Sequence, residues 1–301
     1  MRAIGVNHYG GPEALEVVEL PDPHAGPGEI RIRVHAAAVN PTDTYVRDGS
    51  RVERQRKDPP PYVPGMDAAG VVDEIGDGVA GVQLGDAVFG HASGGSAAEY
   101  AVLGAWARKP DGTPFEVAGG LPVVGETAVR VLDLLDLREG QTVVIDGASG
   151  GVGSVAVQVA VARGLHVIGT AGPANQTFVR SLGAVATPHG PGLADRVRAL
   201  APDGVDGGVD TAGKGSVHDL IALTGDPAKV ATIADFGAGE LGVQVTSGGR
   251  GQAARLAQVA DLLVAGRLEV PVAATYPLDR IADAYAESRG GHVRGKLLLL
   301  P

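Results

Sequence analysis

Residues 143–153 read VVIDGASGGVG, which is an apolar run followed by a turn rich in glycine. Glycine lets the backbone approach a ligand closely, and a helix that begins at such a turn points its free amide groups at an anion. The turn could therefore hold a phosphate just after Asp146. A tight turn that binds nothing fits the same letters, but the strand–turn–helix context favours phosphate binding.

Two nucleotide-binding patterns fit this turn. Gly147-x-x-x-Gly151-x-Gly153 is typical of short-chain dehydrogenases, whereas Ala148-x-Gly150-x-x-Gly153 is the common dinucleotide fingerprint with its first glycine replaced. Short-chain enzymes carry their glycines near the N-terminus and use a Tyr-x-x-x-Lys pair. Here the turn lies far from the N-terminus, and none of the six tyrosines is followed four residues later by lysine. The second pattern is therefore favoured.

The residues after the next predicted strand indicate which dinucleotide is bound. NAD enzymes commonly place an acidic residue there, where it binds the ribose 2′-hydroxyl. This chain reads GTAGPANQTFVR over residues 169–180, without an acidic residue and without a basic one before Arg180. A carboxylate would repel a 2′-phosphate, so its absence favours NADPH. Neutral hydrogen bonds could come from Thr170, Asn175, Gln176 and Thr177.

The elements that must position this turn change in character along the chain. In the first third, Ile30, Ile32 and Val34 alternate with other residues as in a half-buried strand, and residues 68–76, 87–90 and 97–103 predict further short strands. Several short strands separated by glycine, proline and aspartate predict a small β-barrel or sandwich.

From about Leu121 the pattern alternates between strands and helices. Residues 141–146 and 166–170 predict strands, residues 151–164 predict a helix that ends at Gly164, and residues 204–213 and 229–237 contain further strands. Such alternation predicts a parallel, doubly wound sheet. The tail, residues 276–301, predicts a helix and a final strand that could return to the first domain.

Composition limits the function classes. The chain has 301 residues, enough for two domains, and a net charge of −10. It shows no dense basic cluster and no apolar run long enough to span a bilayer, so we expect neither nucleic-acid nor membrane binding. The basic stretch at residues 51–60 is interpreted as a solvated loop. With no cysteine and no predicted signal peptide, the chain cannot form disulfides or cysteine–metal sites and is expected to be cytoplasmic.

Several ordered stretches carry a family resemblance: AAAVNPTDTYVRDG, PYVPGMDAAGVVDEIGDGVAGVQLGDAVFG, AAEYAVL, LPVVGETA and DGASGGVGSVAVQVA. Together they resemble the zeta-crystallin-like, zinc-independent quinone oxidoreductases of the medium-chain dehydrogenase/reductase superfamily. The resemblance covers nearly the whole chain. It implies an α/β protein with a GroES-like β-barrel substrate domain (residues 1–117 and 268–301), a Rossmann-type NADP(H)-binding domain (residues 118–267) and an active cleft between them. It also implies a homodimer.

Metal chemistry is not expected. Relatives that oxidise alcohols hold zinc through a cysteine that would fall near Asn40 and a histidine in a Gly-His-Glu stretch. This chain has Gly65-Met66-Asp67 at the second place, and Asp67 alone cannot build a zinc site. The chemistry left is hydride delivery from a reduced nicotinamide to an electron-poor acceptor such as a quinone or an α,β-unsaturated carbonyl.

The resemblance assigns catalytic roles to Asn40, Asp43, Tyr45 and Thr127. Asn40 and Asp43 would orient the site, and Tyr45 would contact the nicotinamide or donate a hydrogen bond to the substrate carbonyl. Alternatively, Asn40 and Asp43 cap a helical turn, and Thr127 occupies the start of a helix.

The resemblance, together with the neutral residues after the second strand, also gives the cofactor contacts. These are Tyr45, Thr127, Ser149, Gly150, Gly151, Val152, Thr170, Gly172, Asn175, His189, Gly213, Phe236 and Gly237. His189 could equally be a surface loop residue. Arg294 and Lys296 could reach phosphate or face solvent, and solvent is favoured.

Three functions remain open from sequence. The first is an NADPH-dependent quinone reductase, and the second an enoyl or enone reductase, for example of secondary metabolism. The third is a non-catalytic NADPH-binding protein, because a lens crystallin lies within this family. The segment after Phe236 also looks shorter than in the family, which affects the expected substrate pocket and dimer edge.

Overall fold

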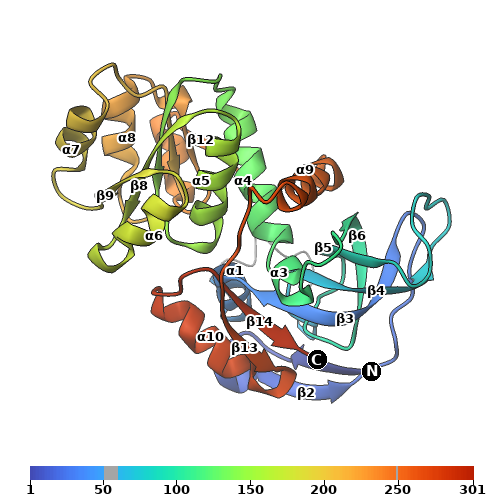
Figure 1. Ribbon diagram of the computed structural model, residues 1–301. Coiled ribbons are helices and arrows are strands. Elements are labelled where there is room, and N and C mark those ends of the chain that lie inside the picture. The colour runs from blue at the N-terminus through green and yellow to red at the C-terminus, as the bar shows by residue number, and fades with distance from the viewer. Residues whose placement is uncertain (51–59, 249) are drawn as a thin grey trace. The chain divides into compact units, whose positions relative to one another are not determined.

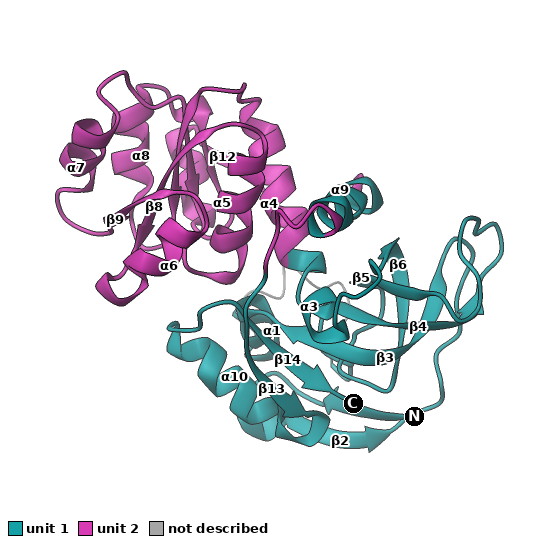
Figure 2. Cartoon of the chain, in the orientation of Figure 1, with its two compact units in different colours: residues 1–123, 252–263, 270–301 teal, residues 124–251, 264–269 magenta. Residues whose placement is uncertain are grey.

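The computed structural model describes residues 1–50, 60–248 and 250–301 (Figure 1). Most of the basic stretch that was interpreted as a solvated loop, residues 51–59, lies outside the described residues. The chain divides into two compact units (Figure 2): residues 1–123, 252–263 and 270–301 form unit 1, and residues 124–251 and 264–269 form unit 2. This division gives residues 252–263 to unit 1, whereas the sequence placed them in the nucleotide-binding domain.

Unit 1 contains a six-stranded sheet in the order β13-β14-β3-β4-β5-β6, with β6 also paired to β3. Neighbours pair antiparallel except β13 and β14. The strands are β3 (Ile30–Val39), β4 (Asp67–Ile75), β5 (Ala87–Ala92), β6 (Tyr100–Arg108), β13 (Val272–Pro277) and β14 (Lys296–Leu300). Because β3 pairs with both β4 and β6, these four strands close into a barrel, which confirms the predicted GroES-like β domain.

The core of unit 1 follows the alternation seen in the sequence. Ile30 and Ile32 are fully buried in the barrel, and Val34 is nearly so. The C-terminal tail returns to this unit, as expected, because β14 pairs with β3. The remaining elements with residues in unit 1 are β1 (Arg2–Val6), η1 (Pro12–Ala14), β2 (Leu15–Glu19), α1 (Pro41–Arg47), α3 (Phe115–Gly119), α9 (Gln252–Val264), η5 (Leu278–Arg280) and α10 (Ile281–Gly290).

Unit 2 contains a six-stranded parallel sheet in the order β12-β11-β10-β7-β8-β9. The strands are β7 (Thr142–Asp146), β8 (His166–Ala171), β9 (Val185–Pro188), β10 (Gly207–Asp210), β11 (Val230–Thr232) and β12 (Gln244–Val245). The first strand, β7, lies at the centre, and the chain winds outward from it in both directions. This order confirms the predicted Rossmann-type sheet and places a topological switch point between β7 and β10.

Helices connect the strands of unit 2. The helix α5 packs on β7 and β8, α6 packs on β8 and β9, and α8 packs on β10 and β11. The helices are α4 (Pro122–Leu135), which begins within unit 1, α5 (Gly151–Ala162), α6 (Gln176–Ser181), α7 (Leu193–Leu200), α8 (Val217–Thr224), η2 (Pro173–Asn175), η3 (Pro227–Lys229) and η4 (Phe236–Leu241).

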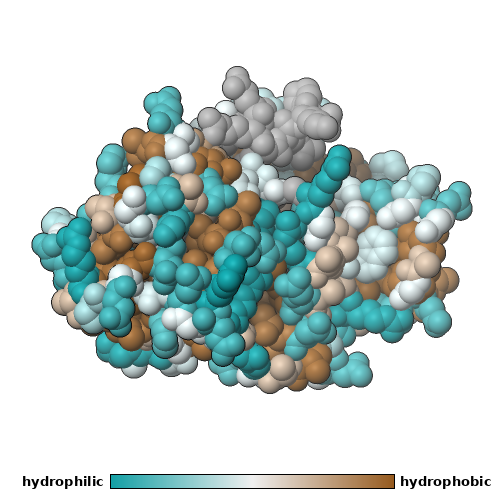
Figure 3. Space-filling model, turned by 90° about the horizontal axis from the view of Figure 1, so that it is seen from above, coloured by the Kyte–Doolittle hydropathy of each residue, from teal (hydrophilic) through white to brown (hydrophobic). Residues whose placement is uncertain are grey.

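The surface mixes residue types. On the face drawn in Figure 3, hydrophobic and hydrophilic residues are interspersed. Among the described residues, the large apolar side chains that are exposed include Leu84 at 66% and Val264 at 74%. Scattered exposed apolar residues of this kind are normal in folded proteins. None of the helices in the described ranges is long and apolar enough to cross a membrane.

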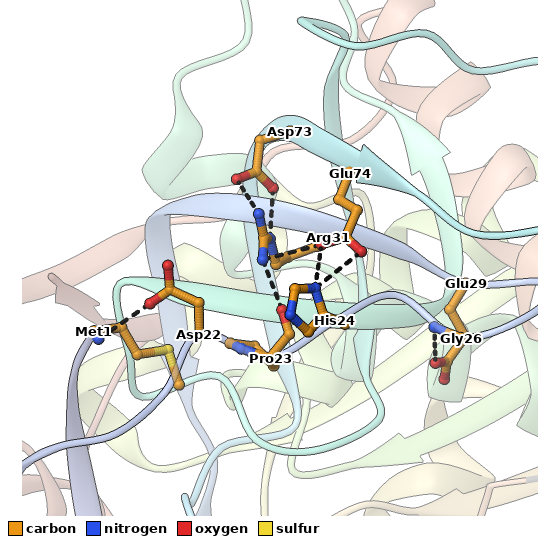
Figure 4. A network of polar contacts seen from close by, with 9 residues as sticks. All are labelled: Met1, Asp22, Pro23, His24, Gly26, Glu29, Arg31, Asp73 and Glu74. Atoms are coloured by element: carbon orange, nitrogen blue, oxygen red, sulfur yellow. Dashed lines mark hydrogen bonds and ion pairs between the residues drawn. The ribbon is translucent and has the colours of Figure 1, made fainter.

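A polar network on unit 1 ties the N-terminal segment to the barrel (Figure 4). Arg31 on β3 donates two 3.0 Å hydrogen bonds to the Asp73 carboxylate on β4 and a third, of 2.8 Å, to the carbonyl of Pro23. His24 lies 3.2 Å from Glu74, the next residue on β4. Two-pronged arginine–carboxylate contacts are geometrically specific, so this network fixes where the segment before β3 crosses the barrel.

Candidate active site

The glycine turn joins β7 to α5 at the central switch point of the unit 2 sheet. Gly147 has φ +79°, which favours glycine, and a Cβ on Gly153 would lie 2.1 Å from the Gly147 carbonyl oxygen. These two positions therefore require glycine for the turn to form. A Cβ on Gly150, the N-cap of α5, would make only an ordinary contact, 3.4 Å from the Gly147 carbonyl oxygen. The protein's own packing therefore does not require glycine at this position, so its glycine leaves room for the backbone at the first turn of α5 to approach a ligand.

A buried pair supports the turn from behind. The Thr170 hydroxyl donates to the Asp146 carboxylate and accepts a 3.2 Å hydrogen bond from the Gly147 amide, while its carbonyl accepts from the Ala148 amide at 2.9 Å. Thr170 is 0% exposed. The prediction that Thr170 contacts the cofactor is therefore wrong: its side chain faces β7 and holds the turn in place.

The loops after β8 and β9 meet the turn at the same edge of the sheet. The Asn175 amide donates to the Ser149 hydroxyl at 3.4 Å, and a Cβ on Gly172 would lie 3.9 Å from Nε2 of the exposed His189. Gln176 donates to the Ala171 carbonyl at 2.7 Å and so fixes the end of β8. The structure thus brings these predicted residues of the turn, β8 and β9 to one edge. Gly151 and Val152 form the first residues of α5 and are half-buried.

The ends of β10 and β11 lie at this edge too. The fully buried Asp210 carboxylate accepts from the Gly213 amide at 2.8 Å and from the Thr232 hydroxyl at 2.7 Å. Gly213 has φ +63° and begins the loop after β10. Phe236 is half-buried and Gly237 exposed at the start of η4, where the Gly237 amide donates to Asp235 at 3.1 Å.

Sequence reasoning missed the two buried aspartates, Asp146 and Asp210. Each ends a parallel strand and accepts hydrogen bonds from a threonine on the neighbouring strand. An acidic residue closing an otherwise apolar strand, as in VVID and GGVD, was the available signal. Buried carboxylates persist only when hydrogen bonds satisfy them, so these two indicate an edge built to hold its loops rigidly.

Thr127 lies on α4 within a second buried polar group. It is 8% exposed, and its hydroxyl accepts a 3.1 Å hydrogen bond from Nη2 of Arg130. Arg130 also donates from Nε to both Glu126 oxygens at 3.1 Å, and from Nη1 to the Thr246 hydroxyl. Sequence reasoning missed the Glu126–Arg130 pair, although its i, i+4 spacing on a predicted helix was visible.

The predicted residues of unit 1 form a buried network at the start of α1. Asn40 is the N-cap of α1, and its backbone amide donates to the Asp43 carboxylate at 2.8 Å. Asp43 therefore does cap the helical turn. The Asn40 side chain donates to Asp67 at 2.9 Å and accepts from Lys296 Nζ at 2.6 Å. Asp67 also accepts from the Val123 amide at 3.1 Å.

The prediction that Lys296 faces solvent is wrong. Lys296 is 3% exposed and donates to the Val39 carbonyl at 3.2 Å as well as to Asn40. Burial lowers its pKa, an effect that the charges of Asp67 and Asp43 oppose. Lys296 therefore supplies the positive charge of the network.

Burial also shifts the two carboxyl groups of this network. It raises the pKa of Asp43 to about 7, with the nearby Asp67 charge adding to the rise and the Asn40 amide opposing it. Burial raises the pKa of Asp67 too, while Lys296 and the hydrogen bonds from Val123 and Asn40 lower it. One ammonium thus faces two carboxyl groups, and Asp43 takes up a proton near neutral pH.

The third predicted residue of this stretch, Tyr45, is half-buried on α1. Helix α1 is fixed at its start by the Asn40 network and at its end by the buried Arg47, whose Nε donates to the Gly10 carbonyl at 3.2 Å and whose guanidinium lies 5.5 Å above the Tyr285 ring. Asn40 and Asp43 are enclosed, so they position α1, and Tyr45 is the predicted residue of this helix with an accessible side chain.

The donor set does not fit zinc. Both carboxylate oxygens of Asp67 already accept hydrogen bonds, one from the Asn40 side chain and one from the Val123 amide. Its neighbour Met66 offers only a thioether sulfur. Among the described residues, no group of three or more histidine, aspartate or glutamate side chains could hold a metal ion.

Comparison with known proteins agrees with this architecture. The family described as "Alcohol dehydrogenase GroES-like domain" matches residues 26–121, and that described as "Zinc-binding dehydrogenase" matches residues 182–299. A curated human quinone oxidoreductase is 30% identical over 100% of this chain and 98% of its own length. This chain belongs to the quinone oxidoreductase family of the medium-chain dehydrogenase/reductase superfamily. The resemblance found in the sequence is thus confirmed.

Other members of the family match in part or in structure. Some curated quinone oxidoreductases reach 40% identity, but over 57% of this chain and 53% of their own length. A solved mycobacterial structure described as complexed with NADPH is 27% identical, covers both chains fully and has a TM-score of 0.87. A structure described as an NAD-dependent alcohol dehydrogenase has 30% identity and the same TM-score, again over both whole chains. The family therefore leaves the cofactor to be argued from this chain's own residues.

Proposed function

We propose that this protein transfers hydride from NADPH to a quinone without a metal ion. The observation that carries the proposal is the glycine turn of unit 2, which is uncrowded at Gly150 and is held by Thr170. It lies beside the end of β8, which is followed by no acidic residue before Arg180. Membership of the quinone oxidoreductase family and the NADPH bound by the mycobacterial relative support it.

The residues of the turn fit a dinucleotide. An added Cβ would clash with protein atoms at Gly147 and Gly153 but would make only an ordinary contact at Gly150. The amides of the first turn of α5 suit a pyrophosphate. We assign the pyrophosphate to Ser149, Gly150, Gly151 and Val152, and the adenosine end to Gly172, Asn175 and His189. The nicotinamide end is assigned to Tyr45, Thr127, Gly213, Phe236 and Gly237.

Selection for NADPH rests on the absence of repulsion. A carboxylate after β8 would bind the 2′-hydroxyl of NADH and repel a 2′-phosphate. Here the corresponding residues are the neutral Gly172 and Asn175, and Nε2 of His189 lies 3.9 Å from where a Cβ on Gly172 would be. A ring N–H of His189 can donate a hydrogen bond to phosphate.

The bound NADPH would supply the hydride. Conjugation in a quinone spreads the incoming charge over its oxygens, so the protein's own part is to position the acceptor and hydrogen-bond its carbonyl. We assign that hydrogen bond to the Tyr45 hydroxyl. Asn40, Asp43, Asp67 and Lys296 hold α1 and thus the backbone of Tyr45, while Asp43 stays within their network and does not itself reach the substrate.

Purified protein and NADPH test the proposal. The loss of reduced-nicotinamide absorbance is followed with a panel of quinones, a panel of enones and with NADH in place of NADPH. Turnover of quinones with preference for NADPH is expected. Turnover of enones but not quinones would identify an enoyl or enone reductase, and tight NADPH binding without any turnover would identify a binding protein. Preference for NADH would contradict the cofactor assignment.

A further inference from the structure

Arg130 organises a compact polar group in unit 2, which we call the Arg130 cluster: the buried Glu126, Thr127 and Arg130 and the half-buried Thr246. Arg130 is 6% exposed and Glu126 is 2% exposed, and they form an ion pair within α4. The guanidinium continues to Thr127 on α4 and to Thr246, which follows β12. Glu126 supplies the countercharge that a buried guanidinium needs, so the cation is held in one orientation.

As a result, the Thr127 hydroxyl is held as a hydrogen-bond acceptor toward Arg130. A hydroxyl carries one proton and two lone pairs, and an arginine can only donate, so the 3.1 Å contact occupies a lone pair of Thr127. Threonine in a helix often donates its proton back to the carbonyl four residues earlier. Within the described parts of the chain, the Thr127 hydroxyl makes no such bond, and its proton has no protein acceptor.

We propose that Arg130 is a positioning residue that makes Thr127 an obligate hydrogen-bond donor to a carbonyl oxygen of a bound molecule. A hydroxyl that accepts from a cation is polarised and donates more strongly. The carbonyl belongs either to the nicotinamide carboxamide or to the substrate. The inference rests on the proposed function, which places Thr127 at the nicotinamide end of the site, and adds the residue that sets the polarity of its hydroxyl.

A double-mutant cycle tests this coupling. Thr127→Val removes the donor with little change in shape, and Arg130→Met removes the cation. Loss of one hydrogen bond weakens binding by about fivefold. We expect each single variant to weaken the same constant by about that factor, and the double variant to weaken it no further, because both remove one interaction. Thr127→Ser keeps the hydroxyl and should restore the wild-type constant.

Two constants distinguish the sources of the carbonyl. NADPH affinity is measured by fluorescence titration without substrate, and the KM for a quinone by steady-state turnover. A weaker NADPH affinity assigns the carbonyl to the carboxamide. An unchanged affinity with a higher KM assigns it to the quinone. Either result supports the proposal.

A matched control shows whether the loss of any ion pair on α4 weakens NADPH affinity or raises the KM for a quinone. Arg163→Met removes a partly exposed ion pair to Asp133, also on α4, and should leave both constants unchanged. If Arg130→Met lowers the melting temperature because it removes the cation paired with the buried Glu126 carboxylate, the paired change of Glu126 and Arg130 to methionine replaces it in the cycle.

The proposal is overturned if the Thr127 and Arg130 effects multiply in the double variant, or if Arg130→Met leaves both constants at wild-type values. A wild-type protein that neither binds NADPH nor turns over a quinone overturns the proposed function, and this inference with it. Normal wild-type behaviour with uncoupled variants overturns this inference alone.

Discussion

Lys296→Met removes the single ammonium of the buried unit 1 network while keeping a side chain of similar length. The change deletes the hydrogen bonds to Asn40 Oδ1 at 2.6 Å and to the Val39 carbonyl at 3.2 Å. Hydrogen bonds from a charged donor contribute about 1.5–3 kcal/mol each, and relief of the ammonium's own burial offsets part of this. We expect the free energy of unfolding to fall by about 3 kcal/mol at pH 8.

The loss in free energy of unfolding caused by Lys296→Met should be smaller at lower pH. Burial already raises the pKa of Asp67 and Asp43, and without Lys296 both rise further. A carboxyl whose folded pKa lies above its unfolded value favours the folded state at low pH, and this stability is lost as the pH rises through the folded pKa. The folded variant can therefore relieve its uncompensated carboxylates by taking up protons at pH 5.5.

Urea unfolding of wild type and variant at pH 8 and pH 5.5 measures both effects. The matched control is Lys109→Met, which also loses two hydrogen bonds to carbonyls, those of Pro110 and Thr113, at a half-exposed site of unit 1. Because water replaces those bonds, the control should cost less than about 1 kcal/mol. Equal costs for the two variants, or a larger cost for Lys296→Met at pH 5.5 than at pH 8, would refute the reasoning.

Three further predictions follow from the same geometry. Asp43→Asn should flatten the decrease in the free energy of unfolding between about pH 4 and the Asp43 pKa of about 7, because in that window the folded wild-type carboxyl keeps its proton while the unfolded one is ionised; urea titrations at several pH values check this. Gly153→Ala places a Cβ 2.1 Å from the Gly147 oxygen and should lower the melting temperature, whereas Gly150→Ala, with 3.4 Å of space, should melt like wild type but bind NADPH at least about tenfold more weakly. Tyr45→Phe should lower kcat for a quinone by about tenfold or more and leave NADPH affinity within about twofold; an unchanged kcat and pH profile would remove Tyr45 from the proposed chemistry.

Local sterics explain what could be predicted from sequence. The glycine turn was found because its requirement lies within a few consecutive residues: the Gly147 carbonyl excludes a side chain at Gly153. The two sheets were found because strand alternation and strand–helix alternation are also local patterns. Both therefore appear in the sequence without knowledge of any long-range contact.

Long-range contacts explain what the sequence did not reveal. Lys296 reads as a surface residue before a final strand, yet its partner Asn40 lies 256 residues earlier and is reached only because β14 pairs with β3. Thr170 reads as a neutral ligand for ribose, but the register of β8 on β7 turns its hydroxyl to Asp146. In both cases strand pairing, which spacing does not encode, decides the direction of the side chain.

Turnover of NADPH by a quinone after exhaustive chelation tests the central claim most directly. The protein is treated with a strong chelator, desalted, and assayed for NADPH oxidation with and without added zinc. The account predicts quinone-dependent NADPH oxidation that chelation leaves unchanged and zinc does not increase, because the donor set around Asp67 cannot complete a zinc site. Activity that disappears on chelation and returns with zinc, or the absence of any quinone-dependent oxidation, would contradict it.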